Sequence, residues 1–313
     1  MASVYTLPEG LPKPLEFEKW TPRVVTALGC NPGPFTLGGS NTFLVGTGKS
    51  RLLIDTGEGR PEYLDVLQRA MADSGCDSLQ AILLTHHHMD HVGGIEDVQK
   101  KFGPVPVHKC HRRMRTVDPD EVTEDPHARV YEGGDEEKYV NIADGEVFRT
   151  EGATLTAHYT PGHCDDHMVF FLHEEQGLFS GDNVLGFGTT TFEDLSDYMD
   201  SLNKMLQLKP AVMYPNHGPL ITNGCGKVEE YIKHRNLREG HIVAGLKHAE
   251  KDGRTALEIV KEVYLGLDPK LVPAAARNVG HHLRRLAKAG RVTSHVTESG
   301  ELRWQLLKTP APL

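Results

Sequence analysis

The sequence predicts an α+β fold with a large N-terminal domain over residues 1–225 and a small winged-helix-like domain over residues 226–313. Short apolar segments alternate with helix-like segments in the first part, which fits two β-sheets between helices. Metal-ligand side chains follow several of the apolar segments, and the last part has the order helix, helix, hairpin. At 313 residues the chain exceeds the usual size of a single core, so two domains are expected.

The elements of the first part follow from local patterns. Residues 61–74 predict a helix, because Pro61 suits the first turn and Gly75 suits the end. The apolar run at residues 79–84 predicts a buried strand. We also expect strands at residues 43–45, 52–54, 105–108, 155–159, 168–172, 178–180 and 211–214, and helices at residues 95–101 and 194–206.

One segment of the first part is strongly acidic. Residues 118–138 contain nine carboxylates against Arg129 and Lys138, and they have little apolar content. Such a segment cannot bury enough apolar surface to form a packed element, so a mobile surface loop is predicted.

The last part is expected to begin with a long helix from residue 226 to about residue 251. Thr255 and Glu258 form a potential capping box for a helix at residues 259–265. A further helix at residues 274–289 is followed by Gly290, a common stop signal. Two strands, at residues 291–296 and 301–306, then flank a Thr-Glu-Ser-Gly turn and predict the hairpin wing.

The motif His-x-His-x-Asp-His follows directly after the strand at residues 79–84. In an extended segment His86 and His88 point the same way, because side chains alternate with a period of two. Asp90 and His91 come where the chain turns into a helix, so they can serve a second ion. Two ions a few ångströms apart with water between them make a hydrolytic centre.

The alternative is a chance histidine-rich tract, since the chain has 18 histidines. The pattern recurs downstream, however: His163, Asp182 and His217 each follow an apolar, strand-like run. Functional side chains commonly occupy such strand-to-loop junctions. The recurrence favours one metal site assembled from four segments.

These seven positions resemble the dinuclear-site motifs of the metallo-β-lactamase superfamily. The resemblance implies a four-layer αββα sandwich. It assigns His86, His88 and His163 to one metal, assigns Asp90, His91 and His217 to a second, and places Asp182 between the two. Imidazole and carboxylate ligands without thiolates suit Zn²⁺, with Mn²⁺ or iron as substitutes. An Asp at position 182, where the β-lactamases of the superfamily often have Cys, favours its hydrolase and nuclease branches.

The resemblance extends over nearly the whole chain to the beta-lactamase-like protein 2 group. It is carried by residues 28–37, 40–48, 53–57, 161–168, 192–202 and 234–239. Animal members of that group are endoribonucleases that cleave single-stranded RNA. Fungal relatives with the same architecture are thioesterases that act on acyl carrier proteins. The resemblance therefore implies a dinuclear zinc hydrolase with single-stranded RNA as substrate, and an acyl or coenzyme A thioester as the alternative.

Several further side chains have expected roles around the metals. Asp90 and Asp182 can orient an attacking hydroxide, and His167 can donate to a phosphate or leaving group. Asp55, at the end of a strand, is expected to accept a hydrogen bond from a ligand imidazole. The side chain of Cys164 should face away from the ions, and the histidines expected to be structural are His87, His108 and His111.

The charge differs between the two domains. Residues 226–313 contain 16 basic and 10 acidic residues, net +6, and residues 1–225 contain 18 and 33, net −15. On the helix at residues 274–289, a basic face is predicted from Arg277, His281, Arg284 or Arg285, and Lys288. Such a face suits an extended polyanion such as RNA. An ordinary solvated surface explains it equally well.

The composition is that of an intracellular enzyme, either cytoplasmic or in the mitochondrial matrix. No apolar stretch approaches 18 residues, so no membrane span is expected. The first twenty residues have neither signal-peptide nor basic presequence character. The five cysteines are widely spaced, which indicates free thiols. The oligomeric state stays open.

Overall fold

The computed structural model describes residues 5–112, 134–247 and 252–307. The chain divides into two compact units, described separately below. Unit 1 comprises residues 1–193 and 197–229, and unit 2 comprises residues 194–196 and 230–313. None of the helices in the described ranges combines the length and the apolar character that a bilayer span requires.

Unit 1 contains two β-sheets. The first has seven strands in sequence order. Its strands are β1 (Phe17–Lys19), β2 (Val24–Leu28), β3 (Asn41–Val45), β4 (Ser50–Ile54), β5 (Ser78–Leu83), β6 (Val107–Lys109) and β7 (Val140–Asn141). Strands β1 to β4 pair antiparallel, and β4 to β7 pair parallel. The carboxyl ends of β4 and β5 therefore meet at one edge of the sheet, where the predicted metal ligands begin.

The second sheet has the strand order β12-β11-β10-β9-β8. Its strands are β8 (Val147–Thr150), β9 (Ala153–Tyr159), β10 (Met168–Leu172), β11 (Gly177–Gly181) and β12 (Val212–Pro215). Strands β11 and β12 pair parallel and the others antiparallel. Side chains from both sheets, including Phe43, Leu83, Leu155, Phe170 and Phe179, form one buried core.

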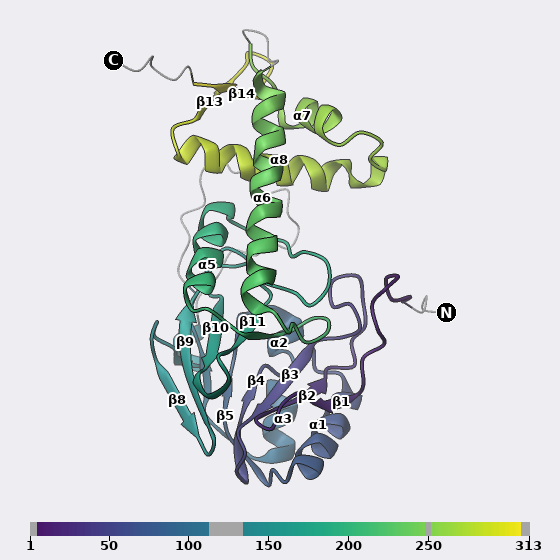
Figure 1. Ribbon diagram of the computed structural model, residues 1–313, viewed down its shortest axis with the longest axis vertical. Helices are drawn as coiled ribbons and strands as arrows, with labels where there is room; N and C mark the ends of the chain where they lie inside the picture. Colours follow the sequence, from purple (N-terminus) through teal and green to yellow (C-terminus); the bar gives the residue numbers. More distant parts are fainter. Residues whose placement is uncertain (1–4, 113–133, 248–251, 308–313) are drawn as a thin grey trace. The chain divides into compact units, whose positions relative to one another are not determined.

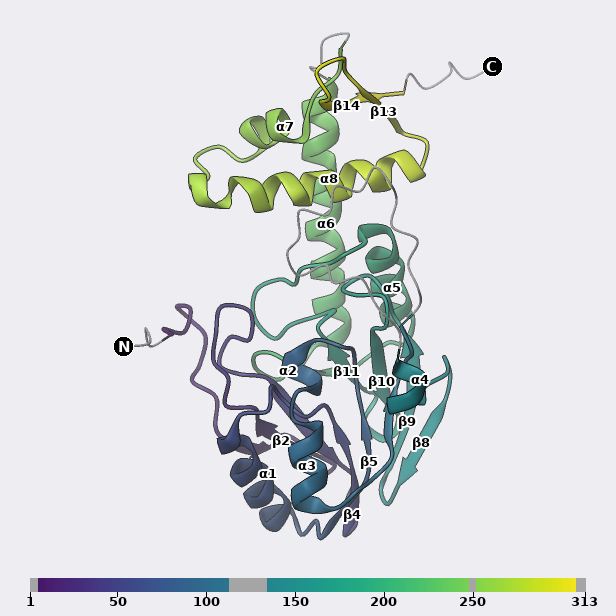
Figure 2. The same ribbon diagram turned by 180° about the vertical axis from the view of Figure 1, so that it is seen from behind.

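Helices cover the outer faces of the two sheets (Figures 1 and 2). On the first sheet, α1 (Pro61–Ser74) packs Leu67 and Ala70 into a second core that also receives Val98 of α3 (Ile95–Phe102). Next to the second sheet, α5 (Leu195–Gln207) is tied to the end of β9 by Ser201 Oγ, which donates to Pro161 O at 2.6 Å. This order of layers confirms the expected αββα sandwich.

The predicted acidic loop at residues 118–138 lies mostly outside the described residues. Its last part is not a loop, because residues Asp135–Lys138 form the short helix α4. The prediction was wrong at that end: Glu136, Glu137 and Lys138, which have good helix propensity, follow Asp135 and close one turn just before β7.

Unit 2 has the expected order of helices and hairpin. Its elements are most of α6 (Gly224–Lys247), then α7 (Ala256–Val263), α8 (Val272–Lys288), β13 (Val292–Val296) and β14 (Leu302–Leu306). Both halves of the predicted capping box are present, since Thr255 Oγ1 accepts from Glu258 N–H and Glu258 accepts from Thr255 N–H. The unit encloses its own core around Ile242, Val279 and Trp304.

A buried histidine in unit 2 gives a pH-dependent stability. His282 of α8 is 1% exposed, and among the described residues neither of its ring nitrogens has a hydrogen-bond partner. Burial, followed by the nearby Arg235, Arg285, Arg238 and His281, lowers the pKa of His282 to about 3. The unfolded chain binds this proton near its ordinary pKa, so acidification favours unfolding of the unit.

We therefore expect unit 2 to lose about 2 kcal/mol of unfolding free energy between pH 7 and pH 5 through His282. Denaturant titration followed by Trp304 fluorescence, with Trp20→Phe as background, measures this loss. The His282→Leu variant should lack this part of the pH dependence. An equal pH slope in that variant would assign the effect to other groups.

Candidate metal centre

The first motif leaves the sheet at the end of β5. His86 is fully buried, and His88 is the residue before the short helix α2 (Met89–Val92). As the alternation predicts, the two imidazoles converge, with His86 Nε2 lying 2.9 Å from His88 Nδ1. Gly94 allows α2 to pack against the loop after β4, because a Cβ there would lie 2.2 Å from Thr56 O.

His163 completes the first group of candidate ligands. It lies in the loop between β9 and β10, and its Nε2 lies 3.1 Å from His88 Nδ1. Its other nitrogen, Nδ1, donates to Thr191 O at 2.9 Å, which leaves the Nε2 lone pair for a metal. Three imidazole nitrogens from two loops therefore face one another, as one half of a dinuclear centre requires.

The second group consists of Asp90, His91 and His217. Asp90 Oδ2 lies 3.3 Å from His91 Nε2 and 3.2 Å from His217 Nε2. Burial alone would lower the pKa of His217, but Asp182 and Asp90 outweigh it and raise that pKa to about 9. A metal ion that binds this group would therefore displace protons, and its binding would strengthen as the pH rises.

Asp182 lies between the two groups. Its Oδ1 is 3.3 Å from His217 Nε2 and 3.6 Å from His91 Nε2, while its Oδ2 is 3.8 Å from His163 Nε2. Asp182 Oδ1 and His91 Nε2 are buried, and within the described part of the chain neither has a hydrogen-bond partner. Two buried polar atoms that face each other without a hydrogen-bond partner fit a bound cation, so the residues present fit a metal centre.

Asp55 contacts the second group through His91, on the side of the ring away from Asp90 and Asp182. It sits at the end of β4 with φ 58°, and its Oδ2 lies 2.8 Å from His91 Nδ1. The same carboxylate accepts from Thr85 N–H at 2.8 Å and from Asn216 Nδ2 at 2.6 Å. Asp55 thereby holds the His91 ring so that Nε2 faces Asp90 and Asp182, in agreement with the expected supporting role.

The Asp55→Asn variant is expected to bind zinc at the second group about 10- to 100-fold more weakly. The amide can still contact His91 Nδ1, but it lacks the negative charge by which the carboxylate makes the imidazole a stronger ligand. Asn tolerates the left-handed backbone at this position, so the fold should persist. Competition with a chromophoric chelator measures the affinity. The exposed pair of Asp77 with Lys49 supplies a control, since Asp77→Asn should leave zinc binding unchanged. Equal affinities of both variants would contradict the role of Asp55.

The structure gives His167 a different environment from the one expected of a proton donor. The ring is fully buried, and its Nε2 accepts a hydrogen bond from Asp182 N–H at 3.1 Å. Gly181 permits this approach, because a Cβ there would lie 2.3 Å from His167 Nε2. His167 is thus placed to orient the Asp182 backbone, whereas Asp90 and Asp182 lie where the metals and their water would be.

Two contacts of the centre were not anticipated. Ser40 Oγ donates to Asp90 Oδ2 at 3.1 Å, and Asn216 Nδ2 donates to Asp55 as described above. Ser40 also pairs with His217 in an isolated β-bridge. The position of Asn216, directly before a ligand, was the available signal for its role. Ser40 had none, because its contact depends on the tertiary fold.

Cys164 lies within reach of the first group, but its thiol turns toward another carboxylate. Its Sγ donates to Asp166 Oδ1 at 3.1 Å. Burial, and after it the neighbouring Asp166, raises the pKa of Cys164 well above its ordinary value. The protonated thiol is a poor metal ligand, which agrees with the expectation that Cys164 does not serve the ions.

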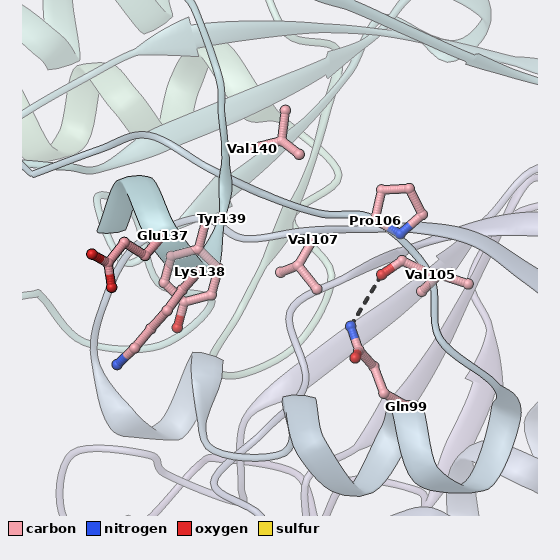
Figure 3. Close-up of a pocket in the computed structure, with 8 residues that line it drawn as sticks. All are labelled: Gln99, Val105, Pro106, Val107, Glu137, Lys138, Tyr139 and Val140. Atoms are coloured by element: carbon pink, nitrogen blue, oxygen red, sulfur yellow. Dashed lines mark hydrogen bonds between the residues drawn. The ribbon is translucent and has the colours of Figure 1, made fainter. Parts of the chain in front are cut away.

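A pocket of about 360 Å³ lies elsewhere, beside β6 and β7. Figure 3 shows that Tyr139, Val107 and Val140 line it together with Gln99, whose Nε2 donates to Val105 O at 3.0 Å. Its lining contains no histidine and one carboxylate, Glu137. The pocket therefore lacks the side chains of a metal site and includes none of the predicted ligands.

The comparisons with known proteins agree with this geometry. Residues 35–217 match the Metallo-beta-lactamase superfamily. The chain belongs to the metallo-β-lactamase superfamily. Residues 255–304 match the Beta-lactamase associated winged helix domain, which confirms the expected second domain type.

Named relatives of this superfamily member include Beta-lactamase-like protein 2 homologs and fungal thioesterases. The chain is 42% identical to a Beta-lactamase-like protein 2 homolog of Drosophila melanogaster, over 87% of this chain and 90% of the relative. It is 38% identical to an Atrochrysone carboxyl ACP thioesterase of Aspergillus chevalieri, over 81% and 77%. A Beta-lactamase domain protein from Burkholderia ambifaria has the same fold, with a TM-score of 0.73, 18% identity and 93% coverage of both chains.

Proposed function

We propose that this protein is a dinuclear zinc hydrolase. The observation that carries the proposal is the placement of Asp182, whose two carboxylate oxygens face separate groups of ligands. His86, His88 and His163 would hold one ion, and Asp90, His91 and His217 the other. When bound, the ions would supply a nucleophilic hydroxide at neutral pH and stabilise negative charge on the substrate.

The protein's own residues prepare that chemistry. Asp55 and Thr191 O fix two of the imidazoles, so their second nitrogens are ready to bind without rearrangement. Asp182 places carboxylate oxygens between the two groups, and Asp90 places one beside His91 and His217, where they can accept a proton from the attacking water. Ser40 holds Asp90 in this orientation.

We infer that the substrate is single-stranded RNA, cleaved as by an endoribonuclease. The support is the chain-wide resemblance to the beta-lactamase-like protein 2 group, two of whose members are 42% and 41% identical to this chain. The net charge of +6 on residues 226–313 also suits a polyanion.

The predicted basic face of α8 is a weaker argument than its sequence suggested. Arg285 forms an ion pair with Glu239, and Lys288 Nζ lies 2.8 Å from Asp194 Oδ2. These two cations are partly neutralised within unit 2 itself. RNA docking is therefore not assigned to this pair of residues.

Thioester hydrolysis is the second candidate. Two fungal relatives at 37% and 38% identity are named Atrochrysone carboxyl ACP thioesterases, and a hydroxide at the same centre can attack a thioester carbonyl. An acyl carrier protein or coenzyme A thioester would then be the substrate.

One parallel assay separates the two substrates. Zinc-loaded protein is incubated with a fluorescent single-stranded RNA and, separately, with an acyl-coenzyme A and an acylated carrier protein. The RNA proposal expects endonucleolytic products that disappear in the His88→Ala variant. Intact RNA together with thioester hydrolysis that needs His88 would replace it with the thioesterase, and inactivity on both substrates would contradict both proposals.

A further inference from the structure

A buried carboxylate lies directly behind the first group of ligands. Asp166 is fully buried and lies three residues after His163, in the loop before β10. It contacts neither of the two ligand groups directly. Its two oxygens instead contact Lys109 and His87 from two other parts of the chain and Cys164 from its own loop.

Lys109, the last residue of β6, supplies the charge that Asp166 needs. The lysine is 1% exposed, and its Nζ lies 2.7 Å from Asp166 Oδ2. An ion pair buried on both sides persists only where each charge compensates the other. His87, Cys164 and Asp166 could by spacing hold a further ion, but the ammonium group already neutralises this carboxylate, so the cluster is not a third metal site.

The other oxygen of Asp166 holds residues adjacent in sequence to two ligands. His87 Nδ1 lies 2.9 Å from Asp166 Oδ1, and His87 stands between His86 and His88. Cys164 Sγ donates to the same oxygen at 3.1 Å, and Cys164 directly follows His163. One carboxylate therefore ties the loop of the first motif and the loop of His163 to the end of β6.

We propose that Asp166 is a positioning residue that sets the distance between His88 and His163, and hence the affinity of the first metal. This inference rests on the proposed metal centre. The two ligands lie on separate loops, and their nitrogens are 3.1 Å apart, so a small shift of either loop would spoil their joint contact with one ion. No direct hydrogen bond from Asp166 to a ligand is needed for this effect, because His87 and Cys164 transmit it through the backbone.

The test compares zinc binding by the full-length protein and its Asp166→Asn variant. Competition with a chromophoric chelator resolves the two binding steps, and His88→Ala and His217→Ala identify which step belongs to which group. His88→Ala identifies the binding step of the first group. Asp166→Asn should lower the zinc affinity of that step by about tenfold or more and leave the affinity of the other step unchanged. Co²⁺ absorption spectra should show altered geometry at the same group.

Two further variants separate positioning from simple stability. Asp166→Asn leaves Lys109 buried without an anion, so the double variant with Lys109→Met should restore thermal stability but not zinc affinity. His87→Leu alters a partly exposed side chain, breaks one link to Asp166 and should weaken the same step. Asp165→Asn is the matched control: this neighbouring carboxylate pairs with Arg112 at 3.0 Å and should leave zinc binding unchanged.

Recovery of full zinc affinity in the double variant would show that Asp166 only neutralises Lys109, and it would overturn the proposal. The proposal would also be overturned if the His87→Leu variant kept the full zinc affinity of the first ligand group. Absence of zinc binding by the wild-type protein would overturn the metal centre itself. Normal binding by wild type and by all Asp166 and His87 variants would overturn only the positioning role.

Discussion

Replacing Asp182 with Asn is expected to lower kcat/KM on the accepted substrate by on the order of 10³-fold or more, the scale seen when a group essential to the reaction is removed. Among the described residues, Asp182 is the carboxylate whose oxygens face both ligand groups, so the variant loses the negative charge that the two proposed ions would share. The amide keeps the shape of the side chain, and the fold should survive. Steady-state kinetics on zinc-loaded protein measure the effect.

A carboxylate outside the centre provides the comparison. Asp97 of α3 is paired only loosely with Lys100, at 3.7 Å on the surface, and Asp97→Asn should leave kcat/KM unchanged. Equal activity of the Asp182→Asn variant and this control would remove Asp182 from the reaction.

Removing the metals is expected to lower the unfolding free energy of unit 1. The loss is about 4 kcal/mol for each ion when the free zinc concentration is a thousand times its dissociation constant. Without zinc, the buried Asp182 and the partly buried Asp90 lie among histidines, and protons on His91 and His217 replace only part of the lost charge compensation. Denaturant titration with and without chelator, followed by Trp20 fluorescence in a Trp304→Phe background, measures the difference. Chelator should have little effect on a His88→Ala/His217→Ala double variant. A chelator effect of equal size there would place the stabilising metal outside the centre.

The strongly patterned elements could be predicted from the sequence. Helix α1 has Pro61 at its start and Gly75 in the left-handed conformation at its end, and the capping box at Thr255 forms as expected. Strand β5 was clear because its apolar run ends directly at the metal motif. Strands β1, β2, β7 and β8 were missed. The first, third and fourth of these are short and have exposed positions, which leave no periodic signal, whereas β2 is a buried apolar run that was overlooked.

The side chains that the structure brings together as candidate ligands could be predicted, whereas most of their supporting residues could not. A ligand must be a particular side chain at a strand end, so the sequence alone suggested all seven positions. A supporting residue only has to reach a ligand in space. Ser40 and Asp166 lie in parts of the chain whose proximity to the centre depends on how the loops fold. His167 shows the converse, since its position near the motif suggested a substrate contact and the fold buries it behind Asp182.

We propose that one chain holds two metal ions between four loops. Anomalous diffraction at the zinc edge from crystals of zinc-loaded protein would locate these ions. The proposal expects two peaks about 3.5–4 Å apart, one beside His86, His88 and His163 and the other beside Asp90, His91 and His217, with Asp182 reaching both. A single peak, or peaks away from these side chains, would contradict it.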